Sequence, residues 1–241
     1  MGQHHQRHLS LAIGRLYLLH RLDADAAFGG DPGPAGEDAR LGHGRPGWHV
    51  ECVAIAMHHL GPAIDVQGGG RDLAFPHHEM CASQGQVMTG ERYARHYSHV
   101  GMVGLDGHKM SKSRGNLVFV RALLDDGVPP AAVRLALLAH HYRSDWEWQD
   151  ADLADAGDRL SRWSRAIAMP AGPNAEAVLQ RVRERLTDDL DTAAALRAID
   201  RWADDALAGR GVAPGAPQAI AALCDALLGV VVPLGAAEPG S

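Results

Sequence analysis

The sequence predicts an α/β fold in which a parallel sheet is followed by a helical bundle. Between residues 45 and 103, short apolar strand segments alternate with helical segments, the order expected of strands joined by crossover helices. Three glycines, Gly68–Gly70, separate one of these strands from the next helix. After residue 129, apolar residues recur only at helical spacing. We therefore expect an atypical, poorly defined segment over residues 1–44, the sheet region over 45–128 and the bundle over 129–241.

Glycine and proline mark the ends of the expected elements. In the sheet region, Gly61-Pro62 stops a helix, and Asp106-Gly107 closes a strand. Pro76 is well placed as the first residue of a helix, because that position needs no hydrogen-bond donor. The expected bounds are a helix over 50–60, a short buried strand over 63–67, a helix over 76–88 and a strand over 97–103.

The bundle is predicted from apolar stripes. Pro129-Pro130 opens its first helix, and later stripes alternate steps of three and four residues. Cys224 lies beside the last stripe and is expected to be plain core. The stripes are Leu153, Ala156, Leu160, Trp163 and Ile167; Val178, Val182 and Leu186; Leu196, Ile199, Ala203 and Leu207; and Ile220, Leu223 and Leu227.

The first 44 residues carry weaker patterns. Leu9, Ile13 and Leu16 share one helical face, and the histidines at positions 4, 5 and 8 favour a solvated cluster over a metal site. Residues 28–36 are rich in glycine and proline and predict a loop.

Composition excludes several classes of protein. The apolar run near the start is interrupted by Arg15, so no uncharged run of about 20 residues is long enough for a membrane span. Three cysteines in 241 residues are too few for a disulfide framework, and a reducing cytoplasm fits best. The net charge of −6 argues against a large nucleic-acid interface, which usually presents a basic face.

The glycine run is a candidate ligand site. Three glycines let the backbone approach a ligand closely, and the N-terminus of the following helix favours anionic groups. Gly68, Gly69 and Gly70, with Arg71 after them, are therefore candidate ligand-binding residues, and Asp72 could bind a hydroxyl or an amine. Taken alone, such a run is equally consistent with a flexible turn.

Two lysines form a second candidate site. Lys109 and Lys112 are the only lysines among 23 basic residues, and they lie three positions apart. An ammonium group is a compact point charge, whereas a guanidinium is a planar fork. On a loop that also carries Ser111, Ser113 and Gly115, these charges would neutralise a departing pyrophosphate.

A thiol and imidazole set is a candidate metal site. Cys52 and His77 offer ligand types that zinc prefers. Cys81 lies four residues after His77, so the two side chains share a helical face. Three protein ligands would leave the fourth position open, as catalytic zinc requires. The alternative is that Cys81 is a small buried apolar residue.

The motifs together resemble a known family. Lys109-Met-Ser-Lys-Ser113 matches the KMSKS signature of class I aminoacyl-tRNA synthetases. Three further stretches are similar to the cysteinyl-tRNA synthetase group, which includes the cysteine ligase family of mycothiol biosynthesis. They are Gly47-Trp-His-Val-Glu-Cys52, the run Gly68-Gly-Gly-Arg-Asp-Leu-Ala-Phe-Pro-His-His-Glu79, and His141-Tyr-Arg-Ser144.

Details within the group favour the ligases. Cysteinyl-tRNA synthetases usually continue Pro-His-His-Glu-Asn-Glu, with the last Glu a zinc ligand, whereas this chain has Pro76-His-His-Glu-Met-Cys81. Gly101-Met-Val-Gly-Leu-Asp-Gly-His-Lys109 and Ser113-Arg-Gly-Asn-Leu-Val118 are also similar to the ligase form. The resemblance covers about residues 28–230 and is strongest over 44–170.

The resemblance implies the C-terminal half of a class I synthetase Rossmann-like sheet and a two-step reaction. Cysteine and ATP would give cysteinyl-adenylate and pyrophosphate, and the amine of glucosaminyl-inositol would then displace AMP. By position, Cys52 and His77 match ligands of one zinc ion. Trp48, Gly70, Asp72 and Val103 match the adenylate pocket, and Lys109 and Lys112 match the mobile loop. Lys109, Gly70 and His77 should then face one pocket.

One part of the family pattern is missing. Residues 1–27 contain neither the HIGH-type motif of class I enzymes nor the cysteine beside it. A truncated gene product, a mispredicted start and one piece of a split protein with a separately encoded N-terminal half would each explain this. Two alternatives to an incomplete ligase stay open: a fragment of a cysteinyl-tRNA synthetase, and a non-catalytic zinc-binding remnant.

Overall fold

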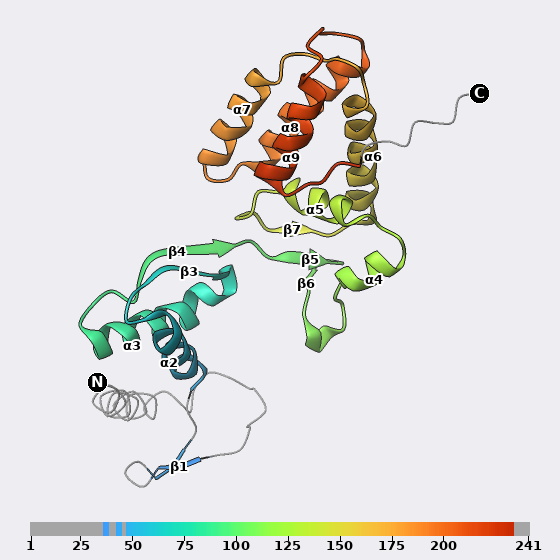
Figure 1. Ribbon diagram of the computed structural model, residues 1–241. Coiled ribbons are helices and arrows are strands. Elements are labelled where there is room, and N and C mark those ends of the chain that lie inside the picture. The colour runs from blue at the N-terminus through green and yellow to red at the C-terminus, as the bar shows by residue number, and fades with distance from the viewer. Residues whose placement is uncertain (1–35, 39–41, 45–46, 234–241) are drawn as a thin grey trace. The chain divides into compact units, whose positions relative to one another are not determined.

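The computed structural model describes residues 36–38, 42–44 and 47–233, and the chain divides into two compact units, residues 1–100 and 101–241 (Figure 1). The expectations for residues 1–35, a helical face, a histidine cluster and a loop, lie outside the described residues. The expected boundaries at residues 44 and 128 stay predictions, and the division by contacts falls between Val100 and Gly101.

The first unit is built around a parallel pair of strands joined by a helix, as the alternation of patterns predicted. Strands β3 and β4 pair in parallel, with Ile64 opposite Ala94 and Gly70 opposite Val100. The antiparallel pair β1 and β2 precedes them. The elements are β1 Gly36–Asp38, β2 Gly42–Gly44, α2 Trp48–Leu60, β3 Ile64–Gly70, the short turns η1 Arg71–Leu73 and η2 Ala74–His78, α3 Glu79–Thr89 and β4 Ala94–Val100.

The glycine run belongs to β3, so the prediction of a turn at Gly68–Gly70 is wrong. Its three residues pair in register with Ser98, His99 and Val100. A Cβ on Gly69 would lie 2.7 Å from His78 Cε1, so a glycine is needed because an imidazole packs against the strand. The prediction of a buried strand is also wrong, since Ile64 is its only buried residue.

Helix α3 begins later than predicted. The Phe75–Pro76 peptide bond is cis and Phe75 has extended backbone angles, so Pro76 does not open the helix, which begins at Glu79. The helix ends at Gly90, whose φ of 78° places it in the left-handed region. The buried apolar core of this unit is small and consists of Val53, Ile64, Cys81, Tyr93 and Ala94.

The second unit begins with a small three-stranded sheet. The strand expected over 97–103 is interrupted after Val100, and β5 begins at Val103. Strand β5 pairs antiparallel with β6 and parallel with β7, a two-residue strand that the sequence patterns did not indicate. The elements are β5 Val103–Leu105, β6 His108–Lys109, η3 Lys112–Arg114, α4 Val120–Asp125, α5 Pro130–Leu138 and β7 Trp146–Glu147.

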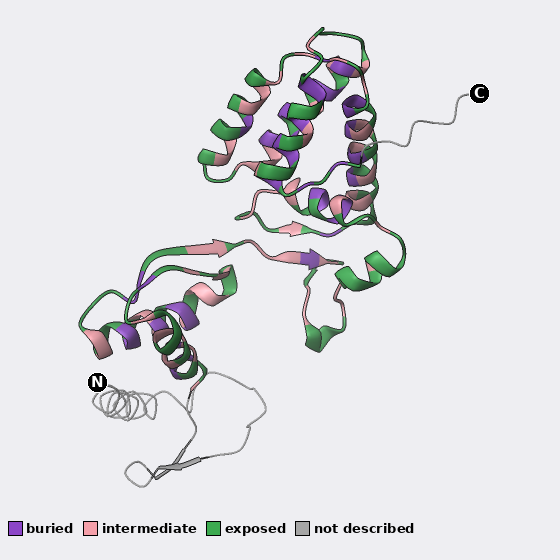
Figure 2. Ribbon diagram, in the orientation of Figure 1, coloured by how far each residue is buried: buried purple, intermediate pink, exposed green. Residues whose placement is uncertain are grey.

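The rest of the second unit is the predicted helical bundle, formed by α5 with α6 Asp150–Ile167, α7 Glu176–Thr187, α8 Thr192–Leu207 and α9 Ala216–Leu228. Figure 2 shows buried residues along the inner faces of these helices. Trp163, Ile199 and Ile220, one from each of three predicted stripes, are fully buried. Cys224 is fully buried too, which confirms its assignment to the core. In the described part of the chain, no helix is long and apolar enough to cross a membrane.

Candidate functional site

An imidazole–thiol cluster, formed by Trp48, His49, Cys52, His77 and Cys81, lies where α2 meets the start of α3. The Trp48 indole stacks on the His77 ring with centroids 3.9 Å apart. His77 Nδ1 lies 2.9 Å from His49 Nδ1, and His77 Nε2 lies 3.9 Å from Cys81 Sγ. One nitrogen of the His77 ring therefore faces a residue 28 positions away, and the other faces Cys81, four positions along the chain.

Burial controls the charge of this cluster. It raises the pKa of the Cys81 thiol to about 12, with a further contribution from the nearby Cys52 thiol. It lowers the pKa of His77. Both groups are therefore neutral near pH 7. Among the described residues, no three His, Cys, Asp or Glu side chains are arranged to hold a metal ion. The structure thus brings His77 and Cys81 together, while the three-ligand site with Cys52 stays a prediction.

His78 faces away from this cluster, toward the strands. Its Nδ1 lies 2.8 Å from His99 Nε2 on β4, and its Nε2 lies 3.1 Å from Gln67 Nε2 on β3. Burial lowers the pKa of His78, and the His99 and His77 rings lower it further. Neither His99 nor Gln67 was predicted as a site residue. The close approach at Gly69 described above is what leaves room for this ring.

A hollow of about 270 Å³, which we call the α3–β4 hollow, opens beside His78 and His99. Its polar lining consists of His78, Glu79, Gln86, Arg92, Tyr93, Tyr97 and His99. Burial raises the pKa of the Tyr97 phenol; Glu79 adds to this effect and Arg92 opposes it. A carboxylate and a guanidinium therefore both act on one hydroxyl group.

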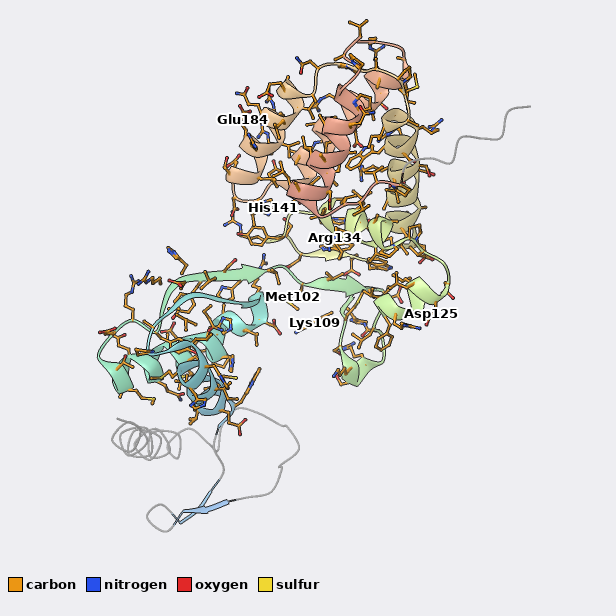
Figure 3. The ribbon with its side chains drawn as sticks, viewed as in Figure 1. Met102, Lys109, Asp125, Arg134, His141 and Glu184 are labelled. Carbon is orange, nitrogen blue, oxygen red and sulfur yellow. The ribbon has the colours of Figure 1, made fainter. Side chains whose placement is uncertain are left out.

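In the second unit, the two lysines lie on a short hairpin and the loop after it (Figure 3 labels Lys109). Asp106 and Gly107, with φ of 55° and 74°, form the turn between β5 and β6. Lys109 ends β6, and Lys112 begins the turn η3; both are exposed. The Asn116 side chain closes the loop, because its Oδ1 accepts from Ser111 N at 2.9 Å and its Nδ2 donates to Lys109 O at 3.3 Å.

The segment before α6 supports this hairpin. Glu147 Oε2 accepts a hydrogen bond from Gly107 N at 3.2 Å, and Asp145 Oδ1 accepts one from Met102 N at 2.8 Å. A Cβ on Gly104 would overlap the Glu147 carboxylate, so a larger residue there would have to displace that side chain. The hairpin that carries Lys109 is therefore fastened by two carboxylates that lie about 40 residues further along the chain.

The His-Tyr-Arg-Ser motif is connected to the helical bundle at Asp189. Arg143 forms an ion pair with the Asp189 carboxylate, His141 Nε2 lies 3.6 Å from its Oδ2, and Tyr142 Oη donates to it at 2.8 Å. Asp189 itself has a φ of 52°, in the left-handed region, at the end of α7. The motif predicted from the sequence thus has a structural role within this unit.

The predicted site residues fall into two groups. Trp48, Cys52, Gly68, Gly69, Gly70, Arg71, Asp72, His77 and Cys81 belong to the first unit, and Val103, Lys109 and Lys112 to the second. In the first group, Arg71 and Asp72 form the exposed turn that directly follows β3. His49 and Asn116 were overlooked although both stand inside recognised motifs. His99 stands in a predicted strand, where no local pattern singled it out.

The family of this chain follows from its similarity to known proteins. Residues 30–158 match the model described as the tRNA synthetases class I (C) catalytic domain. The chain belongs to this family. Its fold is that of solved class I synthetases: a leucyl-tRNA synthetase in a ternary complex from Agrobacterium radiobacter matches with a TM-score of 0.62 at 17% identity, over 82% of this chain and 33% of that one. A methionyl-tRNA synthetase from Mycobacterium tuberculosis gives 0.50 at 20% identity, over 68% and 42%.

Several curated relatives carry the name L-cysteine:1D-myo-inositol 2-amino-2-deoxy-alpha-D-glucopyranoside ligase. The relative from Streptomyces griseus is 61% identical over 200 residues, which is 83% of this chain and 49% of the relative. The relative from Thermobifida fusca is 54% identical, over 91% of this chain and 59% of the relative. The chain thus spans about half the length of the curated relatives that it matches.

Proposed function

We propose that this chain carries part of the active site of an ATP-dependent cysteine ligase. In the proposed reaction, the carboxylate of L-cysteine attacks the α-phosphate of ATP, which gives cysteinyl-adenylate and releases pyrophosphate. The amine of glucosaminyl-inositol then attacks the carbonyl carbon, which gives an amide and releases AMP. The observation that carries the proposal is the identity of 54–61% to relatives that bear this ligase name, over 83–91% of this chain.

The first unit supplies the residues for cysteine activation. Trp48 covers one face of His77 at 3.9 Å, and Gly70 and Asp72 lie at the carboxyl end of β3. In open α/β sheets, ligands bind beyond the carboxyl ends of the strands. We propose that Trp48, the glycines of β3, Arg71 and Asp72 bind the cysteinyl-adenylate; the role of Val103 stays a prediction from the sequence.

Zinc is proposed on the chemistry of the donors. A thiol and an imidazole already lie 3.9 Å apart at Cys81 and His77, and Cys52 is close enough to affect the Cys81 thiol. These donors fit zinc. When bound, zinc would supply a Lewis acid that prefers the thiolate of cysteine to the hydroxyl of serine. Cys52 and His77 are the first candidates, with Cys81 as the third.

Lys109 and Lys112 would stabilise the charge that develops on the departing pyrophosphate. Both ammonium groups are exposed on a loop that the Asn116 side chain holds closed. Charges placed where negative charge develops contribute a large part of catalysis, about 100- to 1000-fold per donor. The remainder of the nucleotide fold would come from a further N-terminal region, and the three free cysteines agree with a reducing cytoplasm.

Cysteine-dependent exchange of pyrophosphate into ATP tests this function. The chain would be assayed alone and with the N-terminal half of the Streptomyces griseus relative added. We expect exchange with cysteine and none with serine, and a loss of about 100-fold or more in Lys112→Ala. Arg121→Gln is the matched control, because Arg121 is an exposed cation of the same unit that pairs with Asp125 at 2.9 Å. Absence of exchange in both preparations contradicts the proposal.

The acceptor separates the ligase from a synthetase fragment. After exchange is established, glucosaminyl-inositol should yield an amide and AMP, while transfer RNA should stay unacylated. Formation of cysteinyl-tRNA instead would show a cysteinyl-tRNA synthetase fragment. Zinc content is measured separately: we expect about one zinc per chain, lost in Cys52→Ala and His77→Ala. If Cys81→Ala keeps its zinc, Cys81 is a core residue and not a ligand.

A further inference from the structure

The α3–β4 hollow is not used by the steps proposed above. Those steps place cysteine and ATP against Trp48, His77 and the end of β3, whereas the hollow lies on the other side of the two adjacent histidines. His77 faces α2 and Cys81, while His78 faces β4 and His99. The centroids of the two rings are 5.6 Å apart. A molecule in the hollow would therefore lie one imidazole away from the cluster.

The size of the hollow restricts its ligand. At about 270 Å³ it lies just below the usual range of small-molecule sites, which is roughly 300–1000 Å³. It is lined by residues of α3 and β4 and of the short segments that flank them, all within the first unit. A single ring fits this space better than a whole nucleotide does.

The chemistry of the lining restricts the ligand further. Glu79 offers acceptors and Arg92 offers donors, so their charges cancel and neither an anion nor a cation is preferred. Gln86 and the Tyr97 hydroxyl each supply both kinds of group. A neutral ring that carries many hydroxyl groups requires this mixture, because each hydroxyl donates one hydrogen bond and accepts others. The Tyr97 ring, whose residue is 41% exposed, adds a flat apolar face.

The contacts of His78 give the hollow a rigid inner end. His78 is 2% exposed and is fixed by Gln67 at one nitrogen and by His99 at the other. Buried polar groups that are held at each polar atom keep a single orientation. His99 is only partly buried, so its remaining ring edge is available to a ligand in the hollow.

We propose that the α3–β4 hollow binds the cyclitol ring of the acceptor, a neutral polyhydroxylated ring, through Glu79, Arg92 and Tyr97. This inference rests on the proposed ligase function for the identity of the acceptor. The hollow thereby becomes a specificity site for the second step of the reaction.

Direct binding to the 241-residue chain tests the inference without any turnover. Glucosaminyl-inositol is titrated while imidazole and tyrosine ring signals are followed by NMR, with myo-inositol and AMP as separate probes. We expect glucosaminyl-inositol and myo-inositol to shift the His99 and Tyr97 signals, and AMP to leave them in place. Tyr97→Phe and Glu79→Gln should each weaken binding roughly tenfold, since each removes a hydrogen-bonding group.

Arg95→Gln is the matched control. Arg95 is an exposed cation on the same strand, pairs with Asp65 and does not line the hollow, so this variant should bind like the wild type. Tyr97→Phe keeps the ring and changes no packing, and its circular dichroism spectrum verifies folding. If neither ring compound binds the wild-type chain, or if Tyr97→Phe and Glu79→Gln bind as tightly as Arg95→Gln, the inference is wrong.

The two proposals fail differently. Cysteine-dependent exchange needs no acceptor. A chain that exchanges pyrophosphate but does not bind the cyclitol therefore contradicts only the proposal for the α3–β4 hollow. A chain that binds the cyclitol at Tyr97 but never exchanges pyrophosphate overturns the ligase function and retains a polyol site.

Discussion

The two units bury different kinds of side chain. In the described residues, the apolar core of the second unit has 23 members, from Ala132 to Val232, whereas that of the first unit has five. The first unit buries His49, His77, His78 and Gln84 instead, and these are the buried polar residues of the described chain. One interior is held by apolar packing and the other largely by contacts between polar rings.

The two interiors stabilise their units in different ways. Apolar burial contributes about 25 cal/mol per Å² and needs no particular partner, so a bundle with regular stripes is stable in itself. Buried imidazoles stabilise a fold only when each polar atom has a partner, and His77 and His78 obtain theirs from α2, β3 and β4. The interior of the first unit thus fixes the positions of imidazole rings. We expect the first unit to have a lower free energy of unfolding than the second.

The largest effect should come from the core of the bundle. Trp163 is fully buried, and its Nε1 donates to Asp200 Oδ1 at 2.9 Å. Trp163→Ala leaves a cavity and a carboxylate without that donor, so the free energy of unfolding should fall by about 3–5 kcal/mol. Urea denaturation measures it. Val212→Ala is the control: Val212 is 90% exposed, and a change above about 0.5 kcal/mol there would indicate that the assay does not report core packing.

Substitutions at two neighbouring glycines, Gly68 and Gly69, test how tightly the first unit is packed. A Cβ at position 69 would lie 2.7 Å from His78 Cε1, whereas one at position 68 would come no closer than 4.0 Å to Ser98 O. Gly69→Ala should therefore destabilise the first unit by about 1–3 kcal/mol. Gly68→Ala carries the same backbone change without the clash. Hydrogen exchange of β3 and β4 compares the two, and equal effects would contradict the packing of His78 against the strand.

The alkylation rates of two buried cysteines, Cys81 and Cys224, report how readily each unit opens locally. Burial raises the pKa of both Cys81 and Cys224 to about 12, and the two residues are 1% and 0% exposed. Their chemistry is therefore matched, and alkylation of either requires local opening. We expect Cys81 to react about tenfold faster or more, because its unit has the smaller core, while the partly exposed Cys52 reacts first. Mass spectrometry of labelled peptides gives the rates. Faster alkylation of Cys224 than of Cys81 would contradict the prediction.

The smallest effect should come from the surface. Arg95 and Asp65 form an ion pair at 3.3 Å, with side chains 73% and 83% exposed. Solvent screens such pairs, so Arg95→Gln should change stability by less than about 1 kcal/mol. Urea denaturation in low and high salt checks this. A larger loss would mean that the first unit depends on surface charge more than on its ring contacts.

Much of the fold followed from local patterns. The stripes through Trp163, Ile199 and Ile220 gave the bundle because apolar spacing reports a buried face directly. The strand, helix and strand order gave the parallel pair β3 and β4. The start of α3 and the glycines of β3 were misplaced, since proline and glycine are also used where a chain bends or where a ring packs closely.

The candidate site was predicted in part. Trp48, Cys52, His77 and Cys81 were identified, and the structure groups them near the start of α3. His99 and Gln67 were not, because their role depends on His78 reaching β3 and β4. Asn116 lay inside a recognised motif, but its hydrogen bonds to Ser111 and Lys109 could not be read from its position.

The parallel pair, the helical bundle, the family motifs and the residue types available for chemistry can be read from the amino-acid sequence. The directions of two adjacent histidine rings depend on tertiary packing. His77 and His78 are identical in type and next to each other, yet His77 contacts His49 and Cys81 while His78 contacts His99. Local patterns cannot separate them, because the direction of each ring is set by the partners that packing places around it.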